Sequence, residues 1–179
     1  LSDNHLHVDF SRGRRYRPWI QTMAVWIPDE RRGAAARELF TQARALLFRE
    51  LEKTPEILFC RSGSDIMRTG REEKSGILLA VEGGAIAEGN LERLNDLYES
   101  GVRMMTLTWN GDNELGGGIK GKSQSGLTPF GKQAVKRMEE LGMVIDVSHA
   151  SPALFYDVCE QTEKPFVASH SNVKAVCSH

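Results

Sequence analysis

Short apolar runs alternate with longer amphipathic segments along almost the whole chain. The short runs are rich in β-branched residues and have the length of buried parallel strands. The longer segments have helical spacing, and several begin at a Ser, Thr or Asn that suits a helix N-cap. The pattern predicts strands at 20–27, 57–60, 76–81, 102–107, 144–147 and 166–169. It predicts helices at 34–53, 64–69, 90–99, 128–141 and 151–161.

Strands that alternate with helices indicate a parallel sheet in an α/β protein. A closed (β/α)8 barrel needs eight strands and typically about 250 residues. This chain offers about six predicted strands in 179 residues, without a linker or a low-complexity segment. We therefore expect either an open α/β sheet or part of a barrel.

The composition is that of an ordinary globular domain, with 40% apolar residues, 26% charged residues and a formal net charge of −1. This balance gives no basic footprint for nucleic acid. No apolar run is long enough to predict a membrane span. The cysteines, Cys60, Cys159 and Cys177, form neither a disulfide framework nor a paired metal motif, which favours free thiols.

Three predicted strands end next to a side chain that binds metals in other proteins. Glu82 follows the strand at 76–81, His149 lies just past the strand at 144–147, and His170 follows the last strand. The carboxyl ends of parallel strands meet at one edge of a sheet, where α/β barrels carry their chemistry. A carboxylate and two imidazoles suit zinc or a similar ion. Each residue alone also fits a solvated acid or a structural histidine, so the metal site depends on all three sharing that edge.

Other polar groups leave alternatives open. The segment His5-Leu-His7-Val-Asp9 has the alternate spacing of metal ligands on a strand. A basic, polar run follows it, so we prefer to interpret it as an exposed approach to the first strand. Asp146 is either a carboxylate that orients a metal-binding histidine or a buried, hydrogen-bonded acid. The run 116–118 lacks the context of a phosphate-binding loop and is interpreted as a mobile loop near the site.

Five sequence motifs together resemble the membrane dipeptidase (renal dipeptidase) family, peptidase family M19, and most of all its bacterial branch. They are Val-Glu-Gly-Gly at 81–84, Met-Thr-Leu-Thr-Trp-Asn at 105–110, Gly-Leu-Thr-Pro-Phe-Gly at 126–131, Leu-Gly-Met-Val-Ile-Asp-Val-Ser-His at 141–149 and Ser-His-Ser-Asn at 169–172. Their order and spacing also fit, and the resemblance covers essentially the whole chain.

The resemblance implies a distorted TIM-type (β/α)8 barrel, incomplete here. Residues 1–179 would form a single partial barrel domain without the first strand and the closing C-terminal βα units, and this fragment alone is expected to be inactive. It implies two zinc ions bridged by Glu82, with His149 and His170 as ligands of the second ion. A water or hydroxide between the ions would be the nucleophile. The implied substrate is a dipeptide, with D-residues accepted at its second position, and Trp109, Asn110 and Asp146 are candidates for the substrate pocket.

We expect a cytoplasmic location in a bacterium, and the family's frequent dimers make a homodimer one assembly to test. Many members have a substrate-polarising histidine where this chain has Trp109. That difference leaves open a degenerate member that binds metal without turnover. Another alternative is a different amidohydrolase-like enzyme, a deaminase or lactonase, in which His5 and His7 join His149 and His170. The family's own His-x-Asp pair lies further upstream, so His7 and Asp9 would imitate it by coincidence.

Overall fold

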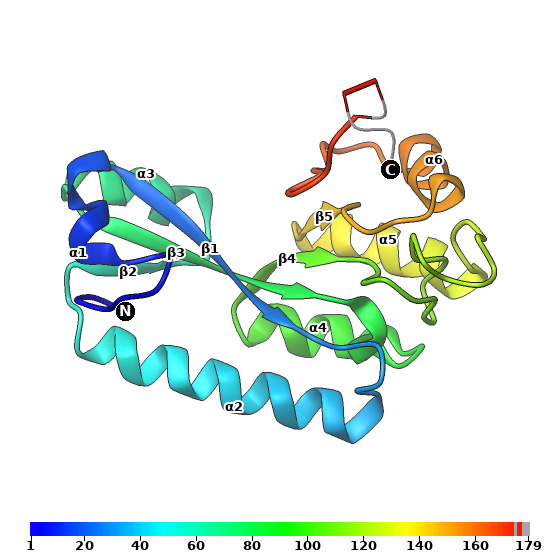
Figure 1. Ribbon diagram of the computed structural model, residues 1–179, viewed down its shortest axis with the longest axis horizontal. Coiled ribbons are helices and arrows are strands. Elements are labelled where there is room, and N and C mark those ends of the chain that lie inside the picture. Colours follow the sequence, from blue (N-terminus) through cyan, green and yellow to red (C-terminus); the bar gives the residue numbers. More distant parts are fainter. Residues whose placement is uncertain (174, 177–179) are drawn as a thin grey trace.

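The computed structural model describes residues 1–173, 175 and 176, and its centre is a twisted parallel sheet of five strands (Figure 1). The strands are β1 (Trp19–Trp26), β2 (Ile57–Cys60), β3 (Ser75–Glu82), β4 (Val102–Thr106) and β5 (Val144–Asp146). The α-helices are α1 (Phe10–Gly13), α2 (Gly33–Glu52), α3 (Gly63–Arg71), α4 (Leu91–Glu99), α5 (Pro129–Leu141) and α6 (Pro152–Gln161). Two 3-10 helices, η1 (Arg14–Tyr16) and η2 (Gly84–Ala87), follow α1 and β3.

A side-chain cap marks the start of every α-helix except α2. The hydroxyl of Thr128 accepts the N–H of Gly131 at 2.9 Å, and a proline opens α5. Ser151 caps α6 in the same way. The predicted start of the helix at residue 64 is wrong, because Ser62 is the cap of α3 and accepts the N–H of Asp65 at 3.2 Å.

The strand register places the carboxyl ends of the strands in one row. Trp26 of β1 pairs with Glu82 of β3, Glu82 pairs with Thr106 of β4, and Thr106 pairs with Asp146 of β5. Asp146 forms a further parallel bridge with Val167. The predicted common edge is therefore present, and Glu82 belongs to it as the last residue of its strand.

The predicted strand at 57–60 exists as β2, but β2 is not one of the strands whose carboxyl ends lie side by side. β2 pairs with the first half of β3, and β4 pairs with the second half of β3 on the same side. The guanidinium of Arg103 in β4 donates to the carbonyl of Arg61 at 2.7 Å, so β2 and β4 follow one another end to end. β2 thus extends the sheet beside the amino-terminal half of β3, whereas Glu82 lies at the carboxyl end of that strand.

The predicted strand at 166–169 is wrong. Val167 keeps two ladder bonds, because its carbonyl accepts the N–H of Val147 and its N–H donates to Ile145, both at 2.9 Å. Pro165 has no N–H, and the N–H of Ser169 donates to the Asp146 carboxylate at 3.0 Å instead of to the ladder. The segment therefore touches the sheet at one point and then leaves it.

The main core lies between the sheet and the helices α2, α4, α5 and α6 (Figure 1). Leu79 and Val81 of β3 pack there with Phe40 of α2, Leu94 of α4 and Met138 of α5. In the part of the chain that the structure describes, no helix is both long enough and apolar enough to cross a membrane. Cys60 and Cys159 are free thiols, as predicted, whereas Cys177 lies outside the described residues.

Candidate metal centre

The carboxyl edge of the sheet brings one carboxylate and two imidazoles together. Oε1 of Glu82 lies 3.1 Å from Nε2 of His149 and 3.5 Å from Nε2 of His170. The two Nε2 atoms are 2.8 Å apart. Among residues 1–173, 175 and 176, no other group of three or more Asp, Glu, His or Cys side chains is arranged to share an ion. The structure thus joins the three residues that the sequence placed at one sheet edge.

The spacing of these three atoms fits a small cation with tetrahedral coordination. With zinc–nitrogen distances of about 2.0–2.1 Å, neighbouring ligands of a tetrahedron lie about 3.3 Å apart. The separations of 2.8, 3.1 and 3.5 Å scatter around that value. The side chain of His170 is 50% exposed and that of Glu82 is 20% exposed, so the donor atoms are accessible to an ion from solvent. The donor set therefore fits a metal of the zinc type.

Two glycines turn the chain immediately after Glu82. Gly83 has a φ of +108°, which L-residues rarely adopt, and its N–H donates to the carbonyl of Thr106 at 3.1 Å. A Cβ on Gly84 would lie 2.6 Å from the carbonyl oxygen of Leu107. The chain therefore crosses close over the end of β4, and Glu82 remains the last side chain of its strand.

His149 is held by a left-handed backbone and by the loop between β4 and α5. Its φ is +65°, which is uncommon for a residue other than glycine. Its carbonyl accepts the N–H of Ile119 at 2.7 Å and the hydroxyl of Thr108 at 3.3 Å. Residues 115–118 of this loop are buried, and Gly118 bridges to Ala150. The Gly-rich loop lies near the site as predicted, but it is packed into the fold, and it secures the turn that carries His149.

Asp146 is fully buried and accepts four hydrogen bonds. Thr106 Oγ1 donates at 2.7 Å, the N–H groups of Ser148 and Ser169 at 3.0 Å, and Ser169 Oγ at 2.6 Å. Oγ of Ser169 also lies 2.8 Å from Nδ1 of His170. This placement favours a role in orienting His170, and it does not support the predicted contact between Asp146 and a substrate.

Acid is expected to weaken the fold through Asp146. Burial opposes ionisation, but the hydrogen bonds from Ser169, Thr106 and Ser148 outweigh it and hold the pKa of Asp146 below its ordinary value of 3.8. Such a carboxyl stabilises the fold above the unfolded-chain pKa, and this stabilisation is lost as the pH falls through the lower folded value. We expect Asp146→Asn to lower Tm at neutral pH and to flatten the fall of Tm below about pH 4, measured by calorimetry. An unchanged acid slope would contradict this.

An aromatic wall stands beside His149. The ring of Trp109 packs edge-on against Trp26, with centroids 4.8 Å apart, and lies 6.3 Å from the His149 imidazole. Asn110 is partly buried, and its carbonyl accepts the N–H of Lys120 at 2.8 Å. Trp109 thus lies where a molecule at the metal centre would meet it. The contacts of Trp109 and Asn110 with a substrate stay predictions.

The N-terminal histidines lie near the start of β1, since His7 borders the same pocket as Trp19, the first residue of that strand. The carboxylate of Asp9 caps α1, accepting the N–H groups of Arg12 and Asn4, each at 2.7 Å. His5 and His7 are exposed just before it. Since α1 precedes the start of β1 and the other end of β1 pairs with Glu82, the alternative centre of His5 and His7 with His149 and His170 is wrong. His179 lies outside the described residues.

Sequence reasoning missed the serines next to the histidines. Ser169 connects His170 to Asp146, and Oγ of Ser148 accepts the backbone N–H of His170 at 3.1 Å. The available signal was the repeated Ser-His pair, Ser148-His149 and Ser169-His170.

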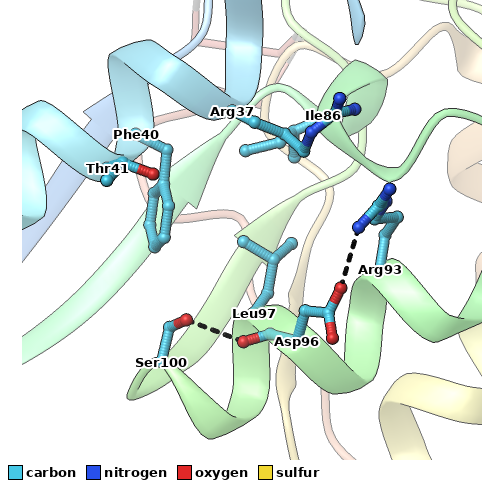
Figure 2. Close-up of a pocket in the computed structure, with 8 residues that line it drawn as sticks. All are labelled: Arg37, Phe40, Thr41, Ile86, Arg93, Asp96, Leu97 and Ser100. Atoms are coloured by element: carbon cyan, nitrogen blue, oxygen red, sulfur yellow. Dashed lines mark hydrogen bonds and ion pairs between the residues drawn. The ribbon is translucent and has the colours of Figure 1, made fainter. Parts of the chain in front are cut away.

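A pocket of about 140 Å³ lies elsewhere, between α2, η2 and α4 (Figure 2). Its charged groups pair with other side chains: Arg93 binds Asp96 at 3.1 Å, and Arg37 binds Glu88. Apolar lining comes from residues such as Phe40. None of the predicted site residues lines this pocket.

The whole chain matches the model of one protein family. The family model described as "Membrane dipeptidase (Peptidase family M19)" matches residues 1–179. The chain belongs to the membrane dipeptidase family. The M19 resemblance read from the five motifs is therefore confirmed.

Relatives within and around the M19 family show how far the match extends. Mouse Dipeptidase 3 is 32% identical over 165 residues, which are 89% of this chain and 33% of the mouse protein. The probable dipeptidase PvdM from Pseudomonas aeruginosa has a TM-score of 0.87 and 25% identity, over 98% of this chain and 48% of that chain. A metallo peptidase from Rhodobacter sphaeroides, solved with a phosphinate mimic of the dipeptide L-Ala-D-Ala, has a TM-score of 0.86 and 21% identity, over 97% of this chain and 58% of that chain.

The chain spans between 33% and 40% of the length of three curated relatives that it matches. Its five parallel strands and their helices superimpose on about half of the PvdM structure. The predicted α/β class with a parallel sheet is confirmed, and the match to about half of the PvdM structure agrees with the prediction of part of a TIM-type barrel.

Proposed function

We propose that the protein is a zinc-dependent dipeptidase, which hydrolyses the peptide bond of dipeptides. The convergence of Glu82 Oε1 with Nε2 of His149 and of His170 carries the proposal, because these donors fit zinc in type and in spacing. Membership of the M19 family and the similarity to Dipeptidase 3 support the reaction class.

Glu82, His149 and His170 would hold one ion, and the second carboxylate oxygen of Glu82 would be available to a neighbouring ion. The proposal of two ions rests on the family resemblance. When bound, zinc would polarise the scissile carbonyl and lower the pKa of a water molecule that attacks it.

The chain's own residues would shape the rest of the reaction. Trp109 and Trp26 form an apolar wall beside His149, which would keep bulk water away from one side of a bound dipeptide. We propose that Trp109 and Asn110 contact the substrate. A dipeptide that ends in a D-residue is a suitable probe, because the structurally similar Rhodobacter protein was solved with an L-Ala-D-Ala mimic. A homodimer and a cytoplasmic location stay predictions.

Metal content and turnover test the proposal together. After dialysis, we expect the protein, prepared as a chain extended at both ends of residues 1–179, to retain zinc by elemental analysis and to hydrolyse L-Ala-D-Ala, with loss of turnover on chelation and recovery on addition of zinc. His149→Ala should abolish zinc retention. His7→Ala is the matched control and should leave the zinc content unchanged. His7 is exposed and lies near the start of β1, whereas the end of β1 pairs with Glu82. No zinc retention in the unmodified protein, or equal losses in both variants, would refute the metal centre.

A binding protein without turnover is the second candidate function. It is favoured by Trp109, whose ring lies near His149 at the position where many family members have a histidine. Zinc retention without hydrolysis of a broad panel of L,L- and L,D-dipeptides would support this function. Zinc-dependent turnover of any member of the panel would exclude it.

A further inference from the structure

We propose that Ser169 is a positioning residue, which connects the buried Asp146 carboxylate to His170 and fixes the tautomer in which Nδ1 of His170 carries the proton and Nε2, near Glu82, does not. The inference deepens the proposed metal centre and rests on it. It is carried by two contacts of one hydroxyl group: Ser169 Oγ lies 2.6 Å from Oδ2 of Asp146 and 2.8 Å from Nδ1 of His170.

The direction of these two hydrogen bonds follows from the number of protons available. A serine hydroxyl has one hydrogen, and a carboxylate only accepts hydrogen bonds. The hydrogen of Ser169 Oγ therefore points to Asp146, and its oxygen is left to accept a hydrogen from His170. Nδ1 of His170 must then carry the proton of the neutral ring, so Nε2 has a free lone pair. That Nε2 atom lies 3.5 Å from Glu82 Oε1 and 2.8 Å from Nε2 of His149.

The orientation of His170 depends more on a hydrogen bond to its side chain than that of Glu82 or His149 does. Glu82 is the last residue of β3, and the backbone at His149 is secured by Ile119 and Thr108. His170 follows an irregular segment, and its side chain is 50% exposed. Its backbone N–H is held by Ser148 Oγ, but among the described residues only Ser169 contacts Nδ1 of its ring.

The alternative direction of the relay is disfavoured by burial. If Ser169 donated to Nδ1 instead, the fully buried Asp146 would lose its shortest hydrogen bond, and a buried carboxylate with fewer donors is destabilised. The buried Asp146 carboxylate therefore determines, through Ser169, which ring nitrogen of His170 carries the proton. Loss of an outer partner of a metal-binding histidine typically weakens metal binding by about 10- to 100-fold.

The tautomer of His170 tests the inference without any metal. Long-range ¹H–¹⁵N correlation spectra of the metal-free protein, with His170 assigned from the spectrum of His170→Gln, should show a protonated Nδ1 and an unprotonated Nε2. Ser169→Ala should move the proton wholly or partly to Nε2, and Ser169→Thr, which keeps the hydroxyl, should retain the original tautomer. Ser171→Ala is the matched control: its hydroxyl contacts Ser148 at 3.4 Å, and the variant should leave the spectrum unchanged. An unchanged tautomer of His170 in Ser169→Ala, with Nδ1 protonated to the same extent as in the unmodified protein, would overturn the inference.

Zinc affinity, measured by competition with a chromophoric chelator, provides the second test. We expect about a 10- to 100-fold loss in Ser169→Ala and less than about a threefold change in Ser169→Thr. Thr106→Val removes a different hydroxyl from Asp146 and should lower Tm while keeping the affinity. An equal loss of affinity in Thr106→Val would assign the effect to general weakening and overturn the positioning role. Absence of zinc binding in the unmodified protein would refute the proposed function, while the tautomer spectrum would still decide the relay.

Discussion

Replacement of Glu82 by glutamine is expected to remove both zinc binding and hydrolysis while the fold is kept. Glutamine has the same size but lacks the negative charge and offers one carbonyl oxygen. Because Glu82 Oε1 is the atom that faces both imidazoles, we expect zinc affinity to fall by more than about a hundredfold. At saturating zinc, kcat/KM for L-Ala-D-Ala should fall by about a thousandfold, since metal polarisation contributes several kcal/mol to the barrier.

Glu99→Gln is the matched control for loss of a carboxylate, because Glu99 is exposed at the end of α4, outside the three-residue centre. It should leave zinc affinity and turnover within about twofold of the unmodified protein. The Tm of metal-free Glu82→Gln should stay within about 3 °C of the original, as for most exposed or partly exposed substitutions. Undiminished zinc affinity in Glu82→Gln would remove the central residue from the proposed site.

Alanine at Gly131 is expected to destabilise the protein strongly, although alanine is the better helix former. Glycine in a helix interior costs about 0.5–1 kcal/mol relative to alanine. At Gly131 of α5, however, an added Cβ would lie 1.9 Å from the carbonyl oxygen of Leu115. Both groups belong to the backbone, so neither can rotate away, and overpacking of this kind costs about 3 kcal/mol or more. We expect Tm to fall by roughly 6–12 °C, measured by calorimetry.

Gly70→Ala tests whether the clash or the helix propensity decides the sign. Gly70 lies in α3, and the nearest atom to its added Cβ would be 3.9 Å away, on Pro18. The free energy of unfolding should therefore rise by about 0.5–1 kcal/mol. A stabilised Gly131→Ala variant would show that the loop around Leu115 adapts easily.

The common edge of the sheet could be predicted because hydrophobic runs and their last residues are local features. Glu82 and His149 were recognisable from the apolar segment before each of them. The place of β2 was not recognisable, because the run at 57–60 has the same composition as a full strand. Only tertiary pairing shows that it shares one side of β3 with β4.

The incorrect prediction of a strand at 166–169 has a different cause. The run is apolar enough for a strand, but the N–H of Ser169 bonds the Asp146 carboxylate, which comes from a residue far away in the sequence. The relay to His170 depends on the same long-range contact, so no local pattern could assign it. The steric need for glycine at 131 was equally hidden, since it arises from the carbonyl of Leu115 in the preceding loop.

A shift in strand register during folding would disrupt the row of residues at the carboxyl edge of the sheet, which consists of Trp26, Glu82, Thr106 and Asp146. Successive side chains of a strand point to opposite faces, so a slip of β3 by one residue would turn Glu82 away from both histidines. A misregistered sheet would have no complete set of donors, and an ion that binds only the native set would stabilise only correctly paired molecules. Zinc in the refolding buffer would then increase the fraction of molecules that refold with the native strand register.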